Sequence, residues 1–299
     1  MEIAILISDI NKIYQCEDSY NPHNIVIQER YGELYKKIGQ LVDFKIPNRL
    51  YFGSEFCQKL MPSLDECKRA YAYALKHGMK FTFVTSALFE NGLKKAEENI
   101  SYMNGLKDEV EVVCNDWGAV HLIKSKYKKI KIVLGRMIDK LPREPRLSKK
   151  HFDTIYGREG VEFLQTPNIF VNEYKEILTD YGIKMVEFDC VPQGINLCDA
   201  RQNNNWGIAL YMPFYYVTTG VICMTQIMSA DENDKFNFPK TCAQTCKNLD
   251  IIMRKPGNFI GEQGLELIRK GNTVYKSIDN ICEYIRMQGC FDRIILQHL

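Results

Sequence analysis

This 299-residue sequence has little excess of either charge. Its 39 Lys and Arg residues against 37 Asp and Glu residues give a formal net charge of +2 at pH 7. Because the net charge is so small, the protein as a whole does not attract polyanions, and nucleic acid is not the default partner. The sequence also lacks the roughly 18 consecutive apolar residues of a membrane span, and Glu2 stands where a secretion signal carries positive charge. These features predict a cytoplasmic protein.

Common catalytic signatures are missing as well. The sequence has no GxSxG, no HExxH, no phosphate-binding loop motif, and no Cys and His at a recognisable catalytic spacing. A peptidase function therefore has no visible catalytic residues to support it.

Cysteine, by contrast, is plentiful, with 11 residues. In a reducing cytosol we expect free thiols and metal ligands rather than disulfides. Cys223 ends an apolar run, and Cys242 and Cys246 form a CxxxC pair in KTCAQTCK. Zinc and iron-sulfur clusters prefer thiolate ligands, so these three cysteines predict most of a four-ligand metal site. In the alternative interpretation, their spacing arises by chance. The others are expected in the core or on the surface, including Cys16, Cys67, Cys114, Cys198, Cys282 and Cys290.

Short apolar runs alternate with helical patterns along most of the chain. The runs at 2–8, 49–53 and 80–86 are typical of strands, and Ser63 with Glu66 predicts a capping box before the helix that follows. This alternation favours an α/β fold with a TIM-like (β/α) barrel, regular or distorted. We expect one domain, 1–299, with an inserted segment at 195–217 near the cysteines and a small β excursion at 251–277.

Several segments resemble the collagenase-like peptidase family. TCAQTCKNL is similar to its GrCaqpCR signature, and TTGVICMTQ to its SGRCLLS segment. RLYFGSEFCQKL resembles the YLGEAVCSKR segment of the UbiV-like iron-sulfur branch, which is the branch most similar overall. CNDWGAVHL and IVLGRMIDK are similar to the segments sDLGvl and aGhaLNvyN. These segments follow the family's order from residue 49 to residue 250.

The resemblance implies a barrel that carries a 4Fe-4S cluster on four cysteines, namely Cys57, Cys223, Cys242 and Cys246. It further implies oxygen-independent hydroxylation, or related redox chemistry, on a small molecule such as an aromatic one, with a UbiU-like paralogue as partner in a heterodimer. Cys190 is a rival ligand, and zinc is a rival metal because four cysteines suit it equally well. Other functions stay open: an RNA-base hydroxylation factor, a collagenase-like peptidase, or a scaffold with a structural cluster.

Polar residues follow several of the predicted strands, where barrel enzymes place their chemistry. Arg136 could clamp a substrate carboxylate, and Asp116 could orient the substrate or move a proton. In the alternative interpretation these two form a structural ion pair with each other. Glu55 and Glu187 are weaker candidates, and the catalytic set predicted from the sequence is Asp116, Arg136 and Glu187.

Overall fold

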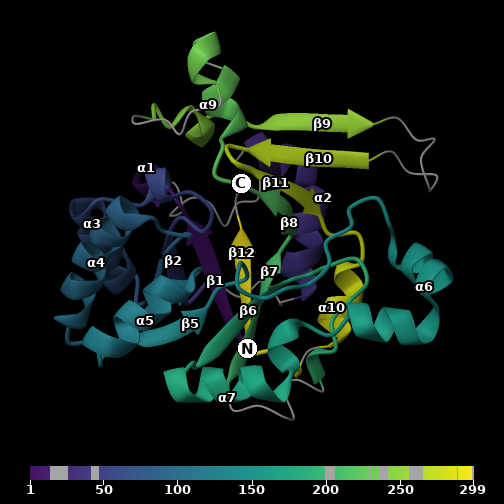
Figure 1. Ribbon diagram of the computed structural model, residues 1–299, viewed down its shortest axis with the longest axis horizontal. Coiled ribbons are helices and arrows are strands. Elements are labelled where there is room, and N and C mark those ends of the chain that lie inside the picture. Colours follow the sequence, from purple (N-terminus) through teal and green to yellow (C-terminus); the bar gives the residue numbers. More distant parts are fainter. Residues whose placement is uncertain are drawn as a thin grey trace.

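The chain folds around a closed barrel of eight parallel strands (Figure 1). The computed structural model describes residues 1–13, 26–41, 47–198, 206–228, 230–235, 242–255, 265–287 and 289–297. The barrel strands are β1 (Glu2–Ile7), β2 (Arg49–Gly53), β3 (Lys80–Val84), β4 (Glu111–Cys114), β5 (Lys131–Leu134), β6 (Met185–Asp189), β7 (Gly207–Met212) and β12 (Arg293–Gln297). Strand β12 closes the ring between β1 and β7. The predicted TIM-like barrel is confirmed, and the three strands named above begin where their patterns begin.

Helices surround the barrel (Figure 1). The α-helices are α1 (Ile10–Ile13), α2 (Val26–Leu41), α3 (Leu64–Lys76), α4 (Glu90–Asn104), α5 (Trp117–Lys126), α6 (Lys149–Leu164, kinked at Gly157), α7 (Asn172–Tyr181), α9 (Met224–Met228) and α10 (Ile281–Arg286). Short 3₁₀ turns lie at Gln58–Leu60, Asn168–Phe170, Glu232–Asp234 and Thr245–Lys247. The predicted capping box is confirmed, because the Ser63 hydroxyl accepts from the Glu66 amide and the Glu66 carboxylate accepts from the Ser63 amide.

A second, antiparallel sheet lies over the carboxyl ends of the barrel strands (Figure 1). Its four strands are β8 (Phe214–Thr219), β9 (Ile251–Lys255), β10 (Leu265–Lys270) and β11 (Thr273–Ser277), in the order β8-β11-β10-β9. Strands β9, β10 and β11 fall within the predicted excursion at 251–277. The predicted insertion at 195–217 differs from the structure, because most of its described part is β7 and the start of β8. β7 is almost wholly buried and β8 is buried over its first three residues, which is why these apolar residues form sheet rather than a surface loop. Residues 199–205 lie outside the described part.

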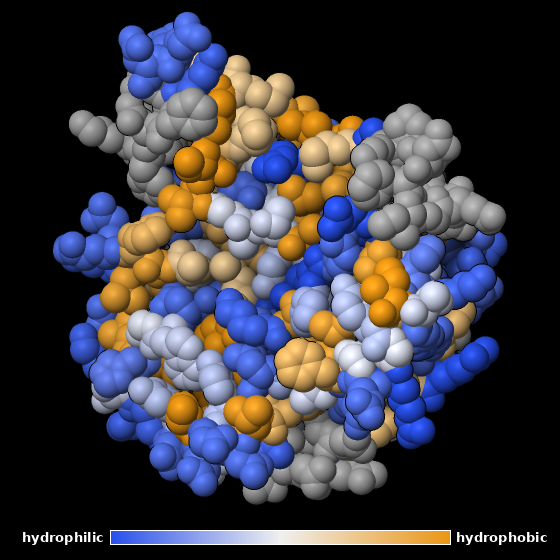
Figure 2. Space-filling view, turned by 45° about the vertical axis from the view of Figure 1, so that its right-hand side comes forward, coloured by the Kyte–Doolittle hydropathy of each residue, from blue (hydrophilic) through white to orange (hydrophobic). Residues whose placement is uncertain are grey.

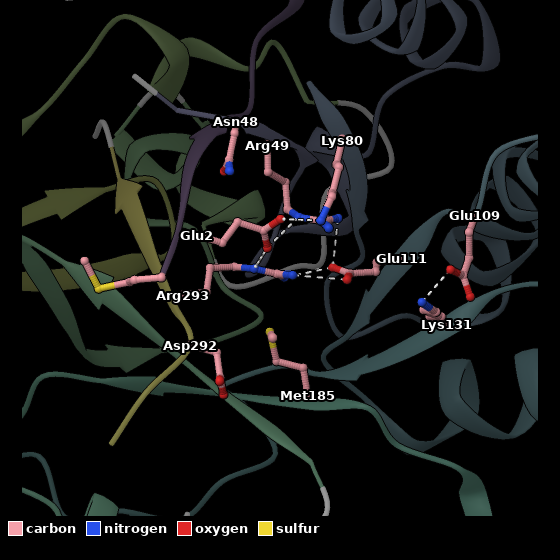
Figure 3. Close-up of a pocket in the computed structure, with 11 residues that line it drawn as sticks. Glu2, Asn48, Arg49, Lys80, Glu109, Glu111, Lys131, Met185, Asp292 and Arg293 are labelled. Atoms are coloured by element: carbon pink, nitrogen blue, oxygen red, sulfur yellow. Dashed lines mark hydrogen bonds and ion pairs between the residues drawn. The ribbon is translucent and has the colours of Figure 1, made fainter. Parts of the chain in front are cut away.

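The barrel interior is mostly apolar and aromatic in its middle, apart from Glu187, and is charged at its amino-terminal end. Apolar and aromatic side chains fill the middle: Ala4, Leu6, Tyr51, Val84, Val113, Val133, Ala209, Tyr211 and Ile295. Below them, Arg49 and Arg293 lie between Glu2 and Glu111 and line a pocket of about 550 Å³ (Figure 3). The Arg293 guanidinium donates to Glu111 at 2.8 Å, and Arg49 Nε lies 3.0 Å from Glu2. Although burial opposes it, the charges of Arg293 and Arg49 lower the pKa of Glu2 to about 2. These ion pairs balance one another's charge at this end of the barrel.

Gly53, the last residue of β2, directs the chain toward the barrel mouth. Its φ of 143° lies in a region that L side chains rarely adopt, and a Cβ there would lie 2.1 Å from the carbonyl oxygen of Val84. A side chain is therefore excluded at this position, just before Glu55 and Cys57.

We predict that Gly53→Ala lowers the free energy of unfolding by more than about 2 kcal/mol, since it combines backbone strain with a clash against backbone. Gly78→Ala is the matched control, because Gly78 has a φ of 65° but no atom near the position of a Cβ. Its cost should be the strain alone, about 1 kcal/mol. Urea denaturation measures both, and equal losses would contradict the role given to Gly53.

Candidate metal centre and barrel mouth

The four cysteines implied as ligands come from the barrel rim and from the loops of the second sheet. Cys57 follows β2 and immediately precedes a 3₁₀ turn. Cys223 immediately precedes α9. Cys242 and Cys246 precede β9, and Cys246 lies within the 3₁₀ turn Thr245–Lys247. One ligand therefore comes from the barrel and three from the segments that carry the second sheet.

These four thiols gather at one place. Burial raises the pKa of Cys57, and the nearby thiols of Cys223 and Cys242 raise it further. Burial likewise raises the pKa of Cys246 to about 11, together with the charges of the other three cysteines. Cys57 and Cys246 thus each lie within electrostatic reach of Cys223 and Cys242, although more than 180 residues separate Cys57 from Cys246.

Gly271 leaves room for the sulfur atoms. It lies in the turn between β10 and β11 with a φ of 59°, and a Cβ there would be 3.3 Å from Cys246 Sγ and 3.8 Å from Cys223 Sγ. A side chain at this position would occupy the space beside the two thiols. Gly271, at the tip of the hairpin, therefore keeps the space beside these sulfur atoms free of a side chain.

Backbone amides act on two of the cysteines. Burial raises the pKa of Cys57, whereas the amides of Lys59 and Leu60 lower it. The Gln244 amide donates to Cys242 Sγ at 3.4 Å, and Gln244 itself has a left-handed φ of 55°. Hydrogen bonds to sulfur stabilise thiolate ligands and tune the clusters that they hold. The Gln244 side chain also donates to the Lys59 carbonyl at 2.7 Å, which ties the CxxxC segment to the Cys57 loop.

The types of donor suit an iron-sulfur cluster. Thiolates are the ligands that such clusters use, and the Gln244 amide donates to one of these four sulfurs. Among the described residues, no three or more His, Cys, Asp or Glu side chains lie at the spacing of a single metal ion. That spacing is not the relevant one for a four-iron cluster, which places each thiolate on a different iron, whereas a zinc ion binds all four at about 2.3 Å.

Two predictions about other cysteines can be compared with the structure. Cys190, the rival ligand, is fully buried in the main core, where burial and the charge of Asp189 raise its pKa. The expectation that the remaining cysteines are free is wrong for Cys198 and Cys290, which form a disulfide across 92 residues. Spacing could not reveal this pair, because only the barrel closure brings the segment before β12 near the segment after β6.

Arg136 is the centre of a buried ion network at the barrel mouth. Its guanidinium binds both oxygens of Glu55, at 2.9 and 2.7 Å, and Asp189 Oδ1 at 2.5 Å. A further donor reaches Gln297 at 3.2 Å, and the Tyr211 ring lies 3.7 Å from the guanidinium carbon. Although burial opposes it, the charges of Asp189 and Glu55 raise the pKa of Arg136 well above its usual value. The alternative interpretation, in which Arg136 pairs with Asp116, is wrong, because Arg136 binds Glu55 and Asp189 instead.

Asp116 acts as the N-cap of α5. Its carboxylate accepts from the Ala119 amide at 2.9 Å and from the Leu88 amide at 3.2 Å. Burial raises its pKa, although these amides pull in the opposite direction. The contacts that the structure gives Asp116 therefore order two loops of the rim, and its catalytic role stays a prediction.

Arg143 and Asp139 were missed by the sequence analysis. Arg143 donates to Asp189 Oδ2 and to Asp139 Oδ1, each at 3.0 Å, and its guanidinium carbon lies 4.0 Å from the centre of the Tyr216 ring. Burial raises the pKa of Asp139 to about 7. The two residues come from an irregular basic segment after β5, where no periodicity or spacing marks either one as buried. This segment closes the mouth beneath the second sheet.

Glu187 lies inside the barrel with no arginine bound to it. It accepts a hydrogen bond from the Tyr211 hydroxyl at 2.9 Å, and the Tyr51 hydroxyl also favours its charged form. Burial, and next the charge of Glu55, raise its pKa to about 8. A carboxyl that stays protonated at neutral pH can donate a proton, so this predicted residue has the state required of a general acid.

We predict that Glu187 makes the folded protein less stable as the pH rises from about 4.5 to about 8. In that window the unfolded chain has lost the proton that the folded chain keeps, so unfolding becomes easier by up to about 1.4 kcal/mol per pH unit. Glu187→Gln should remove this dependence. Urea denaturation across the pH range measures it, with Glu98→Gln, which changes an exposed carboxyl, as the control. Parallel curves for wild type and Glu187→Gln would show that Glu187 ionises normally.

Comparison with known proteins adds no further support. No family model matches this sequence, and no curated protein is significantly similar to it. The resemblance to the collagenase-like peptidase family therefore rests on the quoted segments alone. In the described part of the chain, no helix combines the length and the apolar character that crossing a membrane requires.

Proposed function

We propose that this chain binds a 4Fe-4S cluster through Cys57, Cys223, Cys242 and Cys246 and serves as a component of an oxygen-independent hydroxylase or a related redox enzyme acting on a small molecule. The observation that supports the proposal best is the convergence of four thiols from three separate segments, with a backbone amide directed at one of them. Such a cluster, when bound, supplies one-electron transfer.

The chain's own residues would supply protons and positioning at the mouth. The Glu187 carboxyl can hold a proton at neutral pH, and it accepts a hydrogen bond from Tyr211, which also lies within electrostatic reach of Glu55. Glu55, Phe56 and Cys57 are consecutive, and the Phe56 ring lies 5.3 Å from the guanidinium carbon of Arg136. A proton store and the proposed cluster would thus lie on opposite sides of one buried ion network.

An exposed apolar patch next to the cysteines supports a protein partner, for which a UbiU-like paralogue is our proposal. It comprises Val221, Ile222, Met224, Met228 and Leu249, all of which are exposed. Apolar side chains also gather on the upper part of the face seen in Figure 2. Contiguous exposed apolar residues are typical of protein interfaces, and this patch directly flanks Cys223.

We predict that wild-type protein purified without oxygen is brown and contains nearly equal amounts of iron and acid-labile sulfide. The double variant Cys242→Ala, Cys246→Ala should lose both, because half of the ligand set is gone. Two single variants, Cys190→Ala and Cys282→Ala, serve as controls for the rival ligand and for an exposed thiol, and both should keep the cluster. Absorption spectra with iron, sulfide and zinc analysis measure the result. Colourless wild-type protein, or protein that holds only zinc, would contradict the proposal.

A purely structural cluster is the second candidate function. It is favoured by the complete burial of Arg136 and by the capping bonds of Asp116, because both side chains are already bound within the protein. In this alternative the chain binds its partner but takes no part in proton or electron transfer.

An anaerobic hydroxylation assay separates the two candidates. If the redox proposal holds, we expect product only when cluster-loaded chain, paralogue, reductant, an aromatic acceptor and an organic oxygen-atom donor are combined. The substitution Asp116→Asn keeps the capping oxygen and removes the charge, so a tenfold or greater loss of activity with unchanged cluster content would reveal a catalytic carboxylate. Unchanged activity in Asp116→Asn and in Glu187→Gln would favour the structural cluster.

A further inference from the structure

Asn272 connects two of the loops that carry the predicted ligands. Its side-chain amide donates to the Phe56 carbonyl at 2.8 Å and to the Gly220 carbonyl at 2.7 Å. Phe56 directly precedes Cys57 on the barrel rim, and Gly220 lies three residues before Cys223. One amide group therefore links the barrel side of the site to its second-sheet side.

The conformation of Asn272 is fixed by its neighbours. The residue is 9% exposed, and its side-chain oxygen accepts from the Thr273 hydroxyl at 3.2 Å. Its backbone carbonyl accepts from the Gly220 amide at 3.3 Å, which joins the hairpin tip to the end of β8. Because the side chain is buried and bound at both ends, it has little freedom to release either carbonyl.

The chemistry of the link requires an amide. Both carbonyl oxygens need a donor, and the two N–H groups of one Asn side chain serve both at once. An aspartate of the same shape would present two acceptors to these carbonyls. Gly271, the preceding residue, provides the space beside Cys223 and Cys246, so the two residues of this turn act on three of the four ligand positions.

We propose that Asn272 is a positioning residue for the metal centre, holding the Cys57 loop against the Cys223 loop so that thiols from the barrel and the second sheet stay at cluster spacing. This inference rests on the proposed cluster function. Residues that orient metal ligands through hydrogen bonds typically change metal affinity or activity by about 10- to 100-fold when they are replaced.

The test is the rate of iron loss to a chelator from anaerobically reconstituted protein. We expect Asn272→Asp and Asn272→Ala to load iron and sulfide but to lose iron about 10 to 100 times faster than wild type. The electron paramagnetic resonance spectrum of the dithionite-reduced variants should also shift or broaden, which a loss of global stability alone would not cause.

Asn115→Asp is the matched control. Asn115 is also a buried amide at the barrel mouth, and it donates to the Thr85 carbonyl at 2.7 Å, but it bonds to neither cysteine loop. This variant should be destabilised in urea, yet keep the wild-type rate of iron loss and the wild-type spectrum. If it loses iron as fast as the Asn272 variants, general destabilisation explains the effect and the inference is overturned.

Thr273→Val is a milder variant in case the Asn272 variants do not fold. It keeps the shape of the side chain and removes the hydrogen bond that orients Asn272, so we expect an intermediate rate of iron loss. Wild-type protein that loads a cluster, alongside Asn272 or Thr273 variants that retain iron equally long, would overturn this inference alone. Wild-type protein that takes up no iron and sulfide would overturn the proposed function and this inference together.

Discussion

The structure depends on the ion pairs that the carboxylates of Glu55 and Asp189 form with the buried Arg136. Arg136 has no exposed surface, and an unpaired charge in such a place costs several kcal/mol. Arg136 follows β5, while its partners Glu55, Asp189 and Gln297 lie after β2 and at the ends of β6 and β12. Ends of strands from around the barrel are therefore held in one geometry, because a shift of any one of them would leave a buried charge or donor unsatisfied.

This ion network also sets the position of the metal centre. Cys57 lies two residues beyond Glu55, and the Phe56 ring between them packs on Tyr216 and Tyr275 of the second sheet at centroid distances of 5.0 and 5.8 Å. The Arg136 network therefore fixes the position of the Cys57 loop, which is the barrel side of the cysteine site. On the opposite side, the hairpin tip at Gly271 and Asn272 brings the second sheet to the same place.

Polar side chains also form a connected series through the barrel interior, from Arg293 to Tyr211. Arg293 binds the Tyr51 hydroxyl at 2.5 Å, Tyr51 faces Glu187, and Glu187 binds Tyr211 near the mouth. Barrel interiors are ordinarily filled by branched apolar side chains, so a central carboxyl is kept at a cost in stability. The raised pKa of Glu187 expresses that cost, and it leaves a proton-holding group between the charged pocket of Figure 3 and the mouth.

Local patterns in the sequence determined most of the barrel strands, though not β7, together with the capping box at Ser63 and the CxxxC pair, because periodicity, caps and short spacings act over a few residues. Only the tertiary structure decided the partners of Arg136, which are 53 to 161 residues away, and the disulfide between Cys198 and Cys290. The role of the 195–217 segment was likewise decided by burial on both faces of β7. The convergence of Cys57 with the other three thiols depended on the closure of the barrel and the docking of the second sheet, since no local rule relates residues so far apart in the chain.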